Sequence, residues 1–177
     1  MVVKMRYQRI LIIGNSGSGK STLAVRLGET LGLPVTHLDQ LFWQDGWVSV
    51  SGKEFDRRLE ERLSQPAWVM DGNYDRTLPW RMERCDAIVL LDFNRFTCMT
   101  GVLKRIFHYR GRTRPDMGKG CPERIDVSFL IWILWIFPRT KRRRDLELIR
   151  KYPDKKAFIL KWRSQIPELI RQMQSEQ

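Results

Sequence analysis

The chain has 177 residues, a length that favours one domain able to bury its own core. Its three cysteines and two histidines have no metal-ligand spacing, which argues against a disulfide framework or a structural zinc site. The formal net charge of +12 predicts that the protein binds phosphate groups or another polyanion. The first residues lead directly into the first predicted strand and leave no room for a signal peptide, so we expect residues 1–177 to form one cytoplasmic domain.

A strand, a glycine-rich loop and a helix follow one another at the start of the chain. Residues 9–13 are largely apolar, and leucines recur at helical spacing over residues 23–31. Between them, Gly14 to Ser21 fit the phosphate-binding pattern G-x-x-x-x-G-K-S/T at every position. Such a loop points backbone N–H groups and the positive end of a helix at phosphate, so that Lys20 reaches the β- and γ-phosphates and Ser21 holds Mg²⁺. The residues that we expect to bind ATP are Gly14, Asn15, Ser16, Gly17, Ser18, Gly19, Lys20, Ser21 and Thr22.

Short apolar runs alternate with helical patterns along the rest of the chain. The run at residues 9–13 is followed by others at 35–38, 68–70, 87–91 and 157–160. This alternation predicts an α/β fold with a five-stranded parallel sheet and helices on both faces. Ser51 begins a capping box ahead of one helix, and a last helix is expected to start near Ser164.

Polar side chains follow the predicted strands, at the edge where a parallel sheet binds ligands. Asp39 comes after the second strand and Asp71 after the third. Carboxylates near a phosphate loop hold Mg²⁺ or deprotonate an attacking hydroxyl, so we expect Asp71 to bind Mg²⁺ with Ser21 and Asp39 to lie on the acceptor side. We interpret His37 as a hydrogen-bonded strand residue and Asp92 as part of a turn with a helix cap.

Aromatic residues lie close to these carboxylates in the sequence. Phe42 and Trp43 belong to a stretch that also contains glycine and aspartate and that precedes a helix cap. Packing in a core is less compelling for such a stretch. We therefore expect both side chains to stack on a ring of the acceptor.

The segment from residue 110 to residue 123 combines glycines and prolines with several basic residues. A loop of this length and composition inside a small domain is usually functional. A phosphoryl group in transfer needs guanidinium groups on its oxygens. We therefore interpret the segment as a basic lid.

The longest apolar stretch, residues 129–137, stops at Pro138. It is about half of the ~20 residues that a membrane span requires. We expect a helix buried against the sheet, while a dimer contact or docking on a membrane surface remains open.

Several segments together resemble the bacterial adenylate-kinase-like P-loop proteins of the DNA topology modulation, or FlaR-related, family. They are the opening strand, loop and helix, and residues 37–43, 68–74 and 120–123. The resemblance implies the nucleoside monophosphate kinase fold with a mobile lid. Asp71 and Gly72 match the start of the Asp-Gly-Phe-Pro-Arg segment of adenylate kinases, and Arg105 and Arg110 resemble the paired arginines at the entry to the lid. We therefore expect ATP to contact Arg105, and the acceptor to contact Gly72, Asn73, Tyr74 and Arg76.

These features favour an enzyme, an ATP-binding and Mg²⁺-dependent kinase that phosphorylates a small acceptor such as a nucleotide or nucleoside. The expected catalytic residues are Lys20, Asp39, Asp71, Arg110, Arg112, Arg114, Arg139 and Arg143. The basic charge leaves open a nucleic-acid-associated ATPase or regulator that influences DNA topology, although the sequence contains no nucleic-acid-binding motif. A third alternative is a dimerising or peripheral membrane protein that uses residues 129–137.

Overall fold

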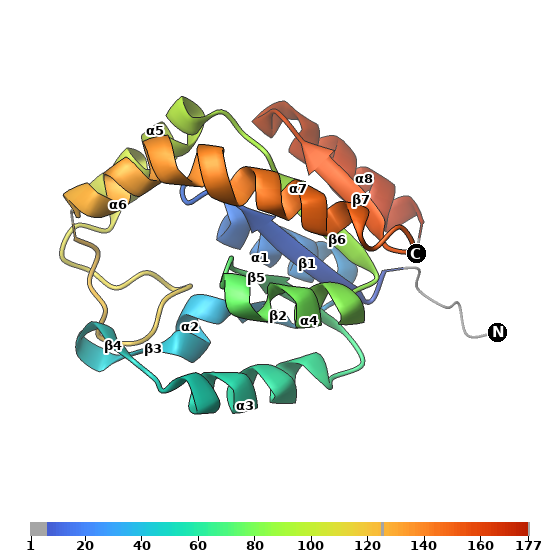
Figure 1. The fold of residues 1–177 in the computed structure, drawn as a ribbon, viewed down its shortest axis with the longest axis horizontal. Coiled ribbons are helices and arrows are strands. Elements are labelled where there is room, and N and C mark those ends of the chain that lie inside the picture. The colour runs from blue at the N-terminus through green and yellow to red at the C-terminus, as the bar shows by residue number, and fades with distance from the viewer. Residues whose placement is uncertain (1–6, 125, 177) are drawn as a thin grey trace.

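A five-stranded parallel sheet forms the centre of the protein (Figure 1). The computed structural model describes residues 7–124 and 126–176. The strands are β1 (Arg9–Gly14), β2 (Val35–His37), β5 (Trp68–Asp71), β6 (Ala87–Leu91) and β7 (Lys156–Leu160), and a separate hairpin contains β3 (Trp43–Gln44) and β4 (Val48–Ser49). The helices are α1 (Lys20–Leu31), α2 (Leu38–Phe42), α3 (Gly52–Leu63), α4 (Leu78–Arg84), α5 (Arg95–His108), α6 (Val127–Ile131), α7 (Arg142–Arg150) and α8 (Ile166–Ser175), with the π-helix η3 (Trp132–Lys141) and the 3₁₀ helices η1 (Asp45–Trp47), η2 (Asp75–Thr77) and η4 (Arg163–Gln165).

The strand order β2-β5-β1-β6-β7 confirms the predicted α/β sheet. Strand β1 lies in the middle, where Ile10 is in register with Val69 of β5 and Ala87 of β6. Helices cover both faces, so the central strands consist of buried apolar residues without alternation. The loops that follow β1 and β5 therefore meet at the carboxyl edge of the sheet, where ligands bind in folds of this kind.

Two hydrophobic cores lie on opposite faces of the sheet. Helices α1, α5 and α8 pack on one face through side chains such as Leu27, Val102 and Met173. Helices α3, α4 and α7 pack on the other face, where Leu59 and Met82 are fully buried. The side chains of β1 alternate between these two cores, so both helical layers hold the strand that leads into the phosphate loop.

One helical segment continues from α6 through η3 into α7, and it crosses Pro138. The apolar stretch stops at Pro138, but the helix does not. A proline removes one backbone donor and crowds the preceding turn, and the wider π-helical turns of η3 accommodate this defect. Only Ile133 and Phe137 of η3 are fully buried, while Trp135 and Ile136 are exposed. In the described ranges, no helix has the length and apolar character needed to cross a bilayer.

The predicted lid segment, residues 110–123, lies against the β3–β4 hairpin. The Gly46 N–H group donates a hydrogen bond of 3.0 Å to the Gly120 carbonyl oxygen. A Cβ atom at Gly118 would lie 2.0 Å from the Trp43 carbonyl oxygen, so only glycine permits this approach. Glycines in the segment thus let its backbone pack on the hairpin.

Candidate active site

The phosphate-binding loop joins β1 to α1 at the carboxyl edge of the sheet. Gly17 has a φ of 77°, and a Cβ atom there would lie 2.1 Å from the Cys98 carbonyl oxygen in α5. Gly14 has a φ of 142°, and its Cβ atom would lie 2.6 Å from the Leu91 carbonyl oxygen. Both positions therefore require glycine, which allows the loop to pack tightly on α5 and on the end of β6.

The N-terminus of α1 carries hydrogen-bond donors that the helix itself does not use. Its first intrahelical hydrogen bond runs from the Leu23 N–H group to the Gly19 carbonyl oxygen, over 2.9 Å. The N–H groups of Lys20, Ser21 and Thr22 precede this bond and have no carbonyl of their own helix to bind. Together with the positive end of the helix dipole, they can bind an anion.

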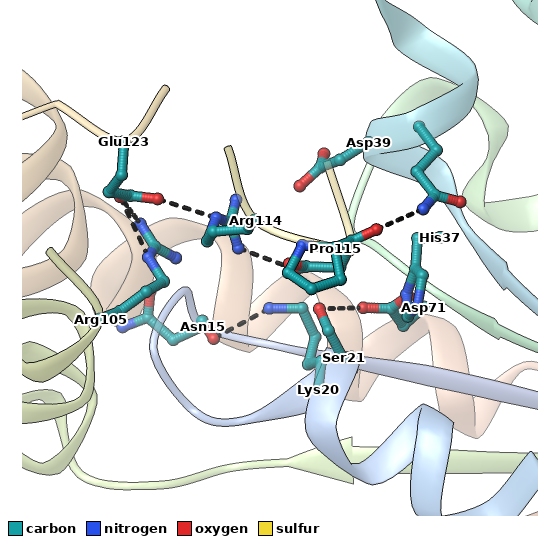
Figure 2. Close-up of polar contacts among 12 residues, drawn as sticks. Asn15, Lys20, Ser21, His37, Asp39, Asp71, Arg105, Arg114, Pro115 and Glu123 are labelled. Carbon is teal, nitrogen blue, oxygen red and sulfur yellow. Dashed lines mark hydrogen bonds and ion pairs between the residues drawn. The ribbon is translucent and has the colours of Figure 1, made fainter. Parts of the chain in front are cut away.

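Two side chains of the loop, those of Ser18 and Lys20, carry hydrogen-bond donors that a phosphate could accept. The Ser18 hydroxyl oxygen is buried without a hydrogen-bond partner in the described part of the chain. Lys20 Nζ donates a hydrogen bond of 3.0 Å to the Asn15 carbonyl oxygen (Figure 2). Burial lowers the pKa of Lys20, and the negative charges of Asp71 and Asp39 oppose this shift. The loop therefore fits the triphosphate of ATP, whose oxygens would accept hydrogen bonds and whose charge would offset the buried ammonium group.

Asp71, the last residue of β5, connects the phosphate loop with β2. Its carboxylate accepts a hydrogen bond of 2.7 Å from Ser21 Oγ and lies 2.5 Å from His37 Nδ1 (Figure 2). Burial disfavours the charged imidazole, but the hydrogen bond and the negative charge of Asp71 outweigh it and raise the pKa of His37. His37 is thus a buried, hydrogen-bonded strand residue, and it lies beside the proposed metal ligand.

The Ser21 hydroxyl and the Asp71 carboxylate suit Mg²⁺, which prefers oxygen ligands. Over residues 7–124 and 126–176, no group of three His, Cys, Asp or Glu side chains could hold a metal ion by itself. Mg²⁺ commonly takes only one or two protein ligands and completes its shell with water and substrate phosphate oxygens. The pair therefore fits a Mg²⁺ ion that arrives with a nucleotide.

A second polar pair consists of Asp39 in α2 and Tyr74. The Tyr74 hydroxyl donates a hydrogen bond of 2.8 Å to Asp39 Oδ1. Burial raises the pKa of Asp39, while the hydrogen bond from Tyr74 opposes this change. The neighbouring Asn73 accepts a hydrogen bond of 3.3 Å from the Gly14 N–H group. Residues 72–74 therefore connect the Asp39 pair with the phosphate loop.

The backbone of residues 72–74 is held by Arg81 of α4, which the sequence analysis missed. Its buried guanidinium group donates hydrogen bonds to the carbonyl oxygens of Gly72 (2.7 Å), Tyr74 (3.0 Å) and Asn73. Burial lowers the pKa of Arg81 to about 10, so the group keeps its positive charge at neutral pH. An arginine in a short helix carries no sequence signal for such a role, because its carbonyl partners are defined only by the fold.

Two arginines converge on Glu123 at the lid. Arg105 Nη2 lies 2.9 Å from Glu123 Oε1, and Arg114 Nε lies 2.8 Å from Glu123 Oε2 (Figure 2). Arg114 also pairs with Asp116 at 2.8 Å. Burial lowers the pKa of Arg105, and the positive charge of Arg114 acts in the same direction. The carboxylates thus allow two like charges to lie close together.

A cleft of about 1480 Å³ runs between the phosphate loop, residues 72–74 and the lid. The predicted site residues that line it are Ser16, Gly17, Ser18, Gly19, Lys20, Ser21, Thr22, Asp39, Asp71, Gly72, Asn73, Tyr74, Arg105 and Arg114. The fold thus brings the loop, both carboxylates and two basic side chains of the lid region to one cavity.

Other predicted site residues lie outside the lining of this cleft, namely Gly14, Asn15, Phe42, Trp43, Arg76, Arg110, Arg112, Arg139 and Arg143. Phe42 packs against Phe55 and Tyr74, with ring centroids 5.4 Å and 5.0 Å apart. It thereby supports a residue of the cleft wall from behind. Arg76 forms an ion pair with Asp56 of α3 instead of facing the cleft.

The basic residues after Pro138 also differ from the expected arrangement. The continued helix places Arg139 on the outer surface, where its guanidinium carbon lies 4.7 Å from the centre of the Trp135 ring. Arg143 pairs with Glu147 one turn further along α7, at 2.8 Å. Both side chains therefore contact groups of their own helical segment and not the cleft.

Arg163 lines the cleft and was also missed by the sequence analysis. Its Nη2 donates hydrogen bonds to the carbonyl oxygens of Gly17 (3.0 Å) and Thr97 (3.3 Å). Arg163 follows β7, so the rule that residues after parallel strands face the ligand predicts its position. Glu123 lies in the predicted lid segment, but its pairing with Arg105 and Arg114 had no sequence signal, because one partner is distant in the sequence and the other belongs to an irregular loop.

The fold is similar to solved kinase structures of low sequence identity. A gluconokinase from Sinorhizobium meliloti is 16% identical, with 98% of this chain and 93% of that chain covered and a TM-score of 0.51. A shikimate kinase from Acinetobacter baumannii in complex with shikimate is 16% identical, with 96% and 92% covered and a TM-score of 0.58. A shikimate kinase from Bacteroides thetaiotaomicron is 18% identical, with 96% and 97% covered and a TM-score of 0.55. No family model and no curated protein matches the sequence.

These similarities establish a P-loop kinase fold for this chain, which confirms the predicted fold class. At this level of identity they concern the fold alone. The resemblance to the DNA topology modulation family stays a prediction.

Proposed function

We propose that the protein is an ATP- and Mg²⁺-dependent phosphotransferase that acts on a small acceptor, a nucleotide or a nucleoside. The observation that carries the proposal is that one cleft contains the phosphate loop, the Ser21–Asp71 pair and the Asp39–Tyr74 pair. The P-loop kinase fold supports it. One of the similar structures is a kinase in complex with shikimate, which is a small molecule.

The donor side of the site consists of the phosphate loop and Asp71. Lys20 and the N–H groups at the start of α1 bind the β- and γ-phosphates. Ser21 and Asp71 would hold Mg²⁺, which shields the phosphate charge when bound. His37 hydrogen-bonds one carboxylate oxygen of Asp71 and so fixes the orientation of this ligand.

The acceptor side is built around Asp39. An oxygen of the acceptor forms a bond to the γ-phosphorus while the bond from this phosphorus to ADP breaks. When that oxygen belongs to a hydroxyl group, its proton goes to Asp39, because burial raises the pKa of this carboxylate and makes it a stronger base. Tyr74 orients Asp39 through its hydrogen bond, and Arg105 and Arg114 balance the charge of the transferred group.

The proposal is tested by measuring ADP release from Mg-ATP with a panel of nucleosides, nucleotides and small hydroxylated metabolites. We expect one acceptor to raise ADP release and to gain a phosphoryl group, detected by mass spectrometry. Duplex DNA is included as a separate addition. Stimulation of hydrolysis by DNA alone, without a phosphorylated product, would overturn the proposal in favour of a nucleic-acid-associated ATPase.

A variant of Lys20 links the activity to this cleft. We expect Lys20→Ala to lower turnover by at least about 100-fold, because it removes a positive charge from the phosphates in transfer. Circular dichroism should show an unchanged fold, since the side chain borders the cleft and not a core. Lys53→Ala, on the exposed side of α3, serves as the matched control and should keep the original turnover.

A further inference from the structure

An exposed apolar surface extends over α5 and over the continuous α6–η3 segment, which packs beside α5 (Figure 1). Its most exposed members are Phe107 at 87%, Val127 at 66% and Phe96 at 62%. Contiguous apolar surface of this kind marks an interaction site. We define the α5–η3 face by the side chains of Phe96, Leu103, Phe107, Val127, Ile131 and Trp135.

Positive charges are interleaved with the aromatic rings of this face. The guanidinium carbon of Arg95 lies 5.2 Å from the centre of the Phe96 ring and 4.8 Å from that of Trp135, so it connects the two helices. Arg139 lies against the same Trp135 ring. Across the described ranges, neither arginine forms an ion pair with a carboxylate, and nor does Lys104 on α5. The face therefore combines apolar side chains with unneutralised cations.

The segments that form the α5–η3 face are rich in basic residues, and the exposed Asp126 lies directly before Val127. Residues 93–112 and 127–144 contain no aspartate or glutamate. A second copy of the chain would bring like charges together across a two-fold axis, which disfavours a dimer through this face. A neutral apolar partner would cover these cations without neutralising them. A partner surface with both apolar and negative groups would cover the apolar side chains of this face and also neutralise its cations.

We propose that the α5–η3 face docks on a membrane surface that contains anionic lipids. The aromatic and aliphatic side chains enter the boundary between headgroups and acyl chains, while Arg95 and Arg139 bind lipid phosphates. The contact is peripheral and parallel to the surface, because the face runs along the sides of the helices. Leu103 and Phe107 also line the cleft, so docking would place this edge of the cleft next to the membrane surface.

Co-sedimentation with vesicles tests this proposal without measuring kinase activity, so its failure is distinct from that of the proposed function. We expect binding to mixed phosphatidylglycerol and phosphatidylcholine vesicles, little binding to pure phosphatidylcholine vesicles, and weaker binding at higher salt. Trp135→Ser and Phe107→Ser should each lower the partition coefficient at least severalfold. Trp80→Ser is the matched control, because Trp80 is about as exposed as Trp135, at 41% and 47%, but lies on α4 at the other face of the sheet.

A pair of charge variants tests the electrostatic part. We expect Arg95→Gln with Arg139→Gln to lower the partition coefficient by roughly 25-fold, since each basic residue at the surface contributes a factor of about five. Lys53→Gln with Arg62→Gln on α3 removes the same charge elsewhere and should change the coefficient less than about twofold.

Equal binding of the original protein to neutral and anionic vesicles would overturn the proposal, as would unchanged binding of the α5–η3 face variants. A dimer in solution that Phe107→Ser dissociates would identify a second copy as the occupant. Loss of duplex DNA binding in the same variants, with vesicle binding retained, would identify nucleic acid instead.

Discussion

Asp71 shows how one side chain can serve two neighbours at the site. One carboxylate oxygen accepts from Ser21 and the other contacts His37, which is buried at the end of β2. A carboxylate must be charged to bind Mg²⁺, and a protonated His37 stabilises that charge. The histidine therefore acts on the site through Asp71 and not through direct contact with the phosphates.

The raised pKa of His37 makes its contribution to stability depend on pH. The protonated imidazole stabilises the folded state fully below its ordinary pKa of about 6.5, and this stabilisation is lost as pH rises through the raised value. We expect His37→Gln to lower the free energy of unfolding by about 1.5–3 kcal/mol at pH 6 and by less at pH 9. Urea denaturation at the two pH values measures the difference.

The other histidine of the chain provides the control for this experiment. His108 is exposed near the end of α5, so His108→Gln should change the free energy of unfolding little at either pH. An equal loss of stability for His37→Gln at pH 6 and pH 9 would contradict the assigned charge interaction with Asp71.

At the scale of elements, residues 72–75 depend on α4, which follows them in the chain, and on η3 and α7, which are distant in the sequence. Arg81 of α4 donates to three successive carbonyl oxygens, of Gly72, Asn73 and Tyr74. Asp75 pairs with Lys141 at the end of η3 and with Arg144 of α7. Tyr74 has a φ of 29°, which is unusual for a residue other than glycine, so this backbone requires support from outside the loop.

A substitution of Arg81 tests this support. Arg81→Met leaves three partly buried carbonyl groups without their donor, so we expect a loss of about 3 kcal/mol in the free energy of unfolding. Because Tyr74 would no longer orient Asp39, kcat should fall more than KM rises. Arg81→Lys should restore part of the free energy of unfolding and part of kcat, since lysine keeps the positive charge but lacks the planar group of donors that arginine has.

The neighbouring Arg84 is the matched control for Arg81. It lies on the same helix but pairs with Glu60 near the surface, so Arg84→Met should cost less than about 1 kcal/mol and leave kcat unchanged. If Arg81→Met lowered the free energy of unfolding but left both kcat and KM unchanged in the folded enzyme, Arg81 would be a structural residue only.

At the scale of the whole molecule, the lid region connects the two sides of the cleft. Arg105 and Arg114 meet Glu123 above the phosphate loop, and Gln40 Nε2 donates a hydrogen bond of 2.6 Å to the Pro115 carbonyl oxygen (Figure 2). The segment thus reaches from α5 to α2. A ligand that contacts the phosphate loop and α2 together would favour this arrangement.

We expect Mg-ATP with its acceptor to lower amide hydrogen exchange over residues 110–123, while exchange in β1 changes little.

Arg114→Ala should lower turnover by about 100-fold and weaken nucleotide binding much less, because the contact of Arg114 with the phosphoryl group strengthens during transfer. Arg112 is exposed outside the cleft lining, so Arg112→Ala is the matched control and should have a small effect. Equal exchange in the free and bound protein, with full turnover of Arg114→Ala, would contradict the interpretation of residues 110–123 as a lid.

Local sequence patterns determined the framework of this protein. The phosphate loop could be predicted because its glycines, lysine and serine are consecutive, and each is required by the backbone or by the phosphates. The central strands β1, β5 and β6 could be predicted because strands covered on both faces need unbroken apolar runs. The edge strands β2 and β7 are less buried and were found from their shorter apolar runs. Asp39 and Asp71 were found by one further step, since residues that follow parallel strands gather at one edge.

Only the tertiary structure decided which partners the remaining polar residues have. Arg81 contacts carbonyl oxygens of an irregular loop, and Glu123 contacts arginines of α5 and of the lid, so no local spacing indicates these contacts. The place of Arg163 after β7 could be predicted, but its contact with Gly17 depends on the packing of distant elements. The sequence marked Pro138 only as the end of an apolar stretch, whereas the structure continues the helical segment through it as a π-helix in which Ile133 and Phe137 are buried. This continuation moves Arg139 and Arg143 away from the cleft and sets Arg139 beside the aromatic rings of the α5–η3 face.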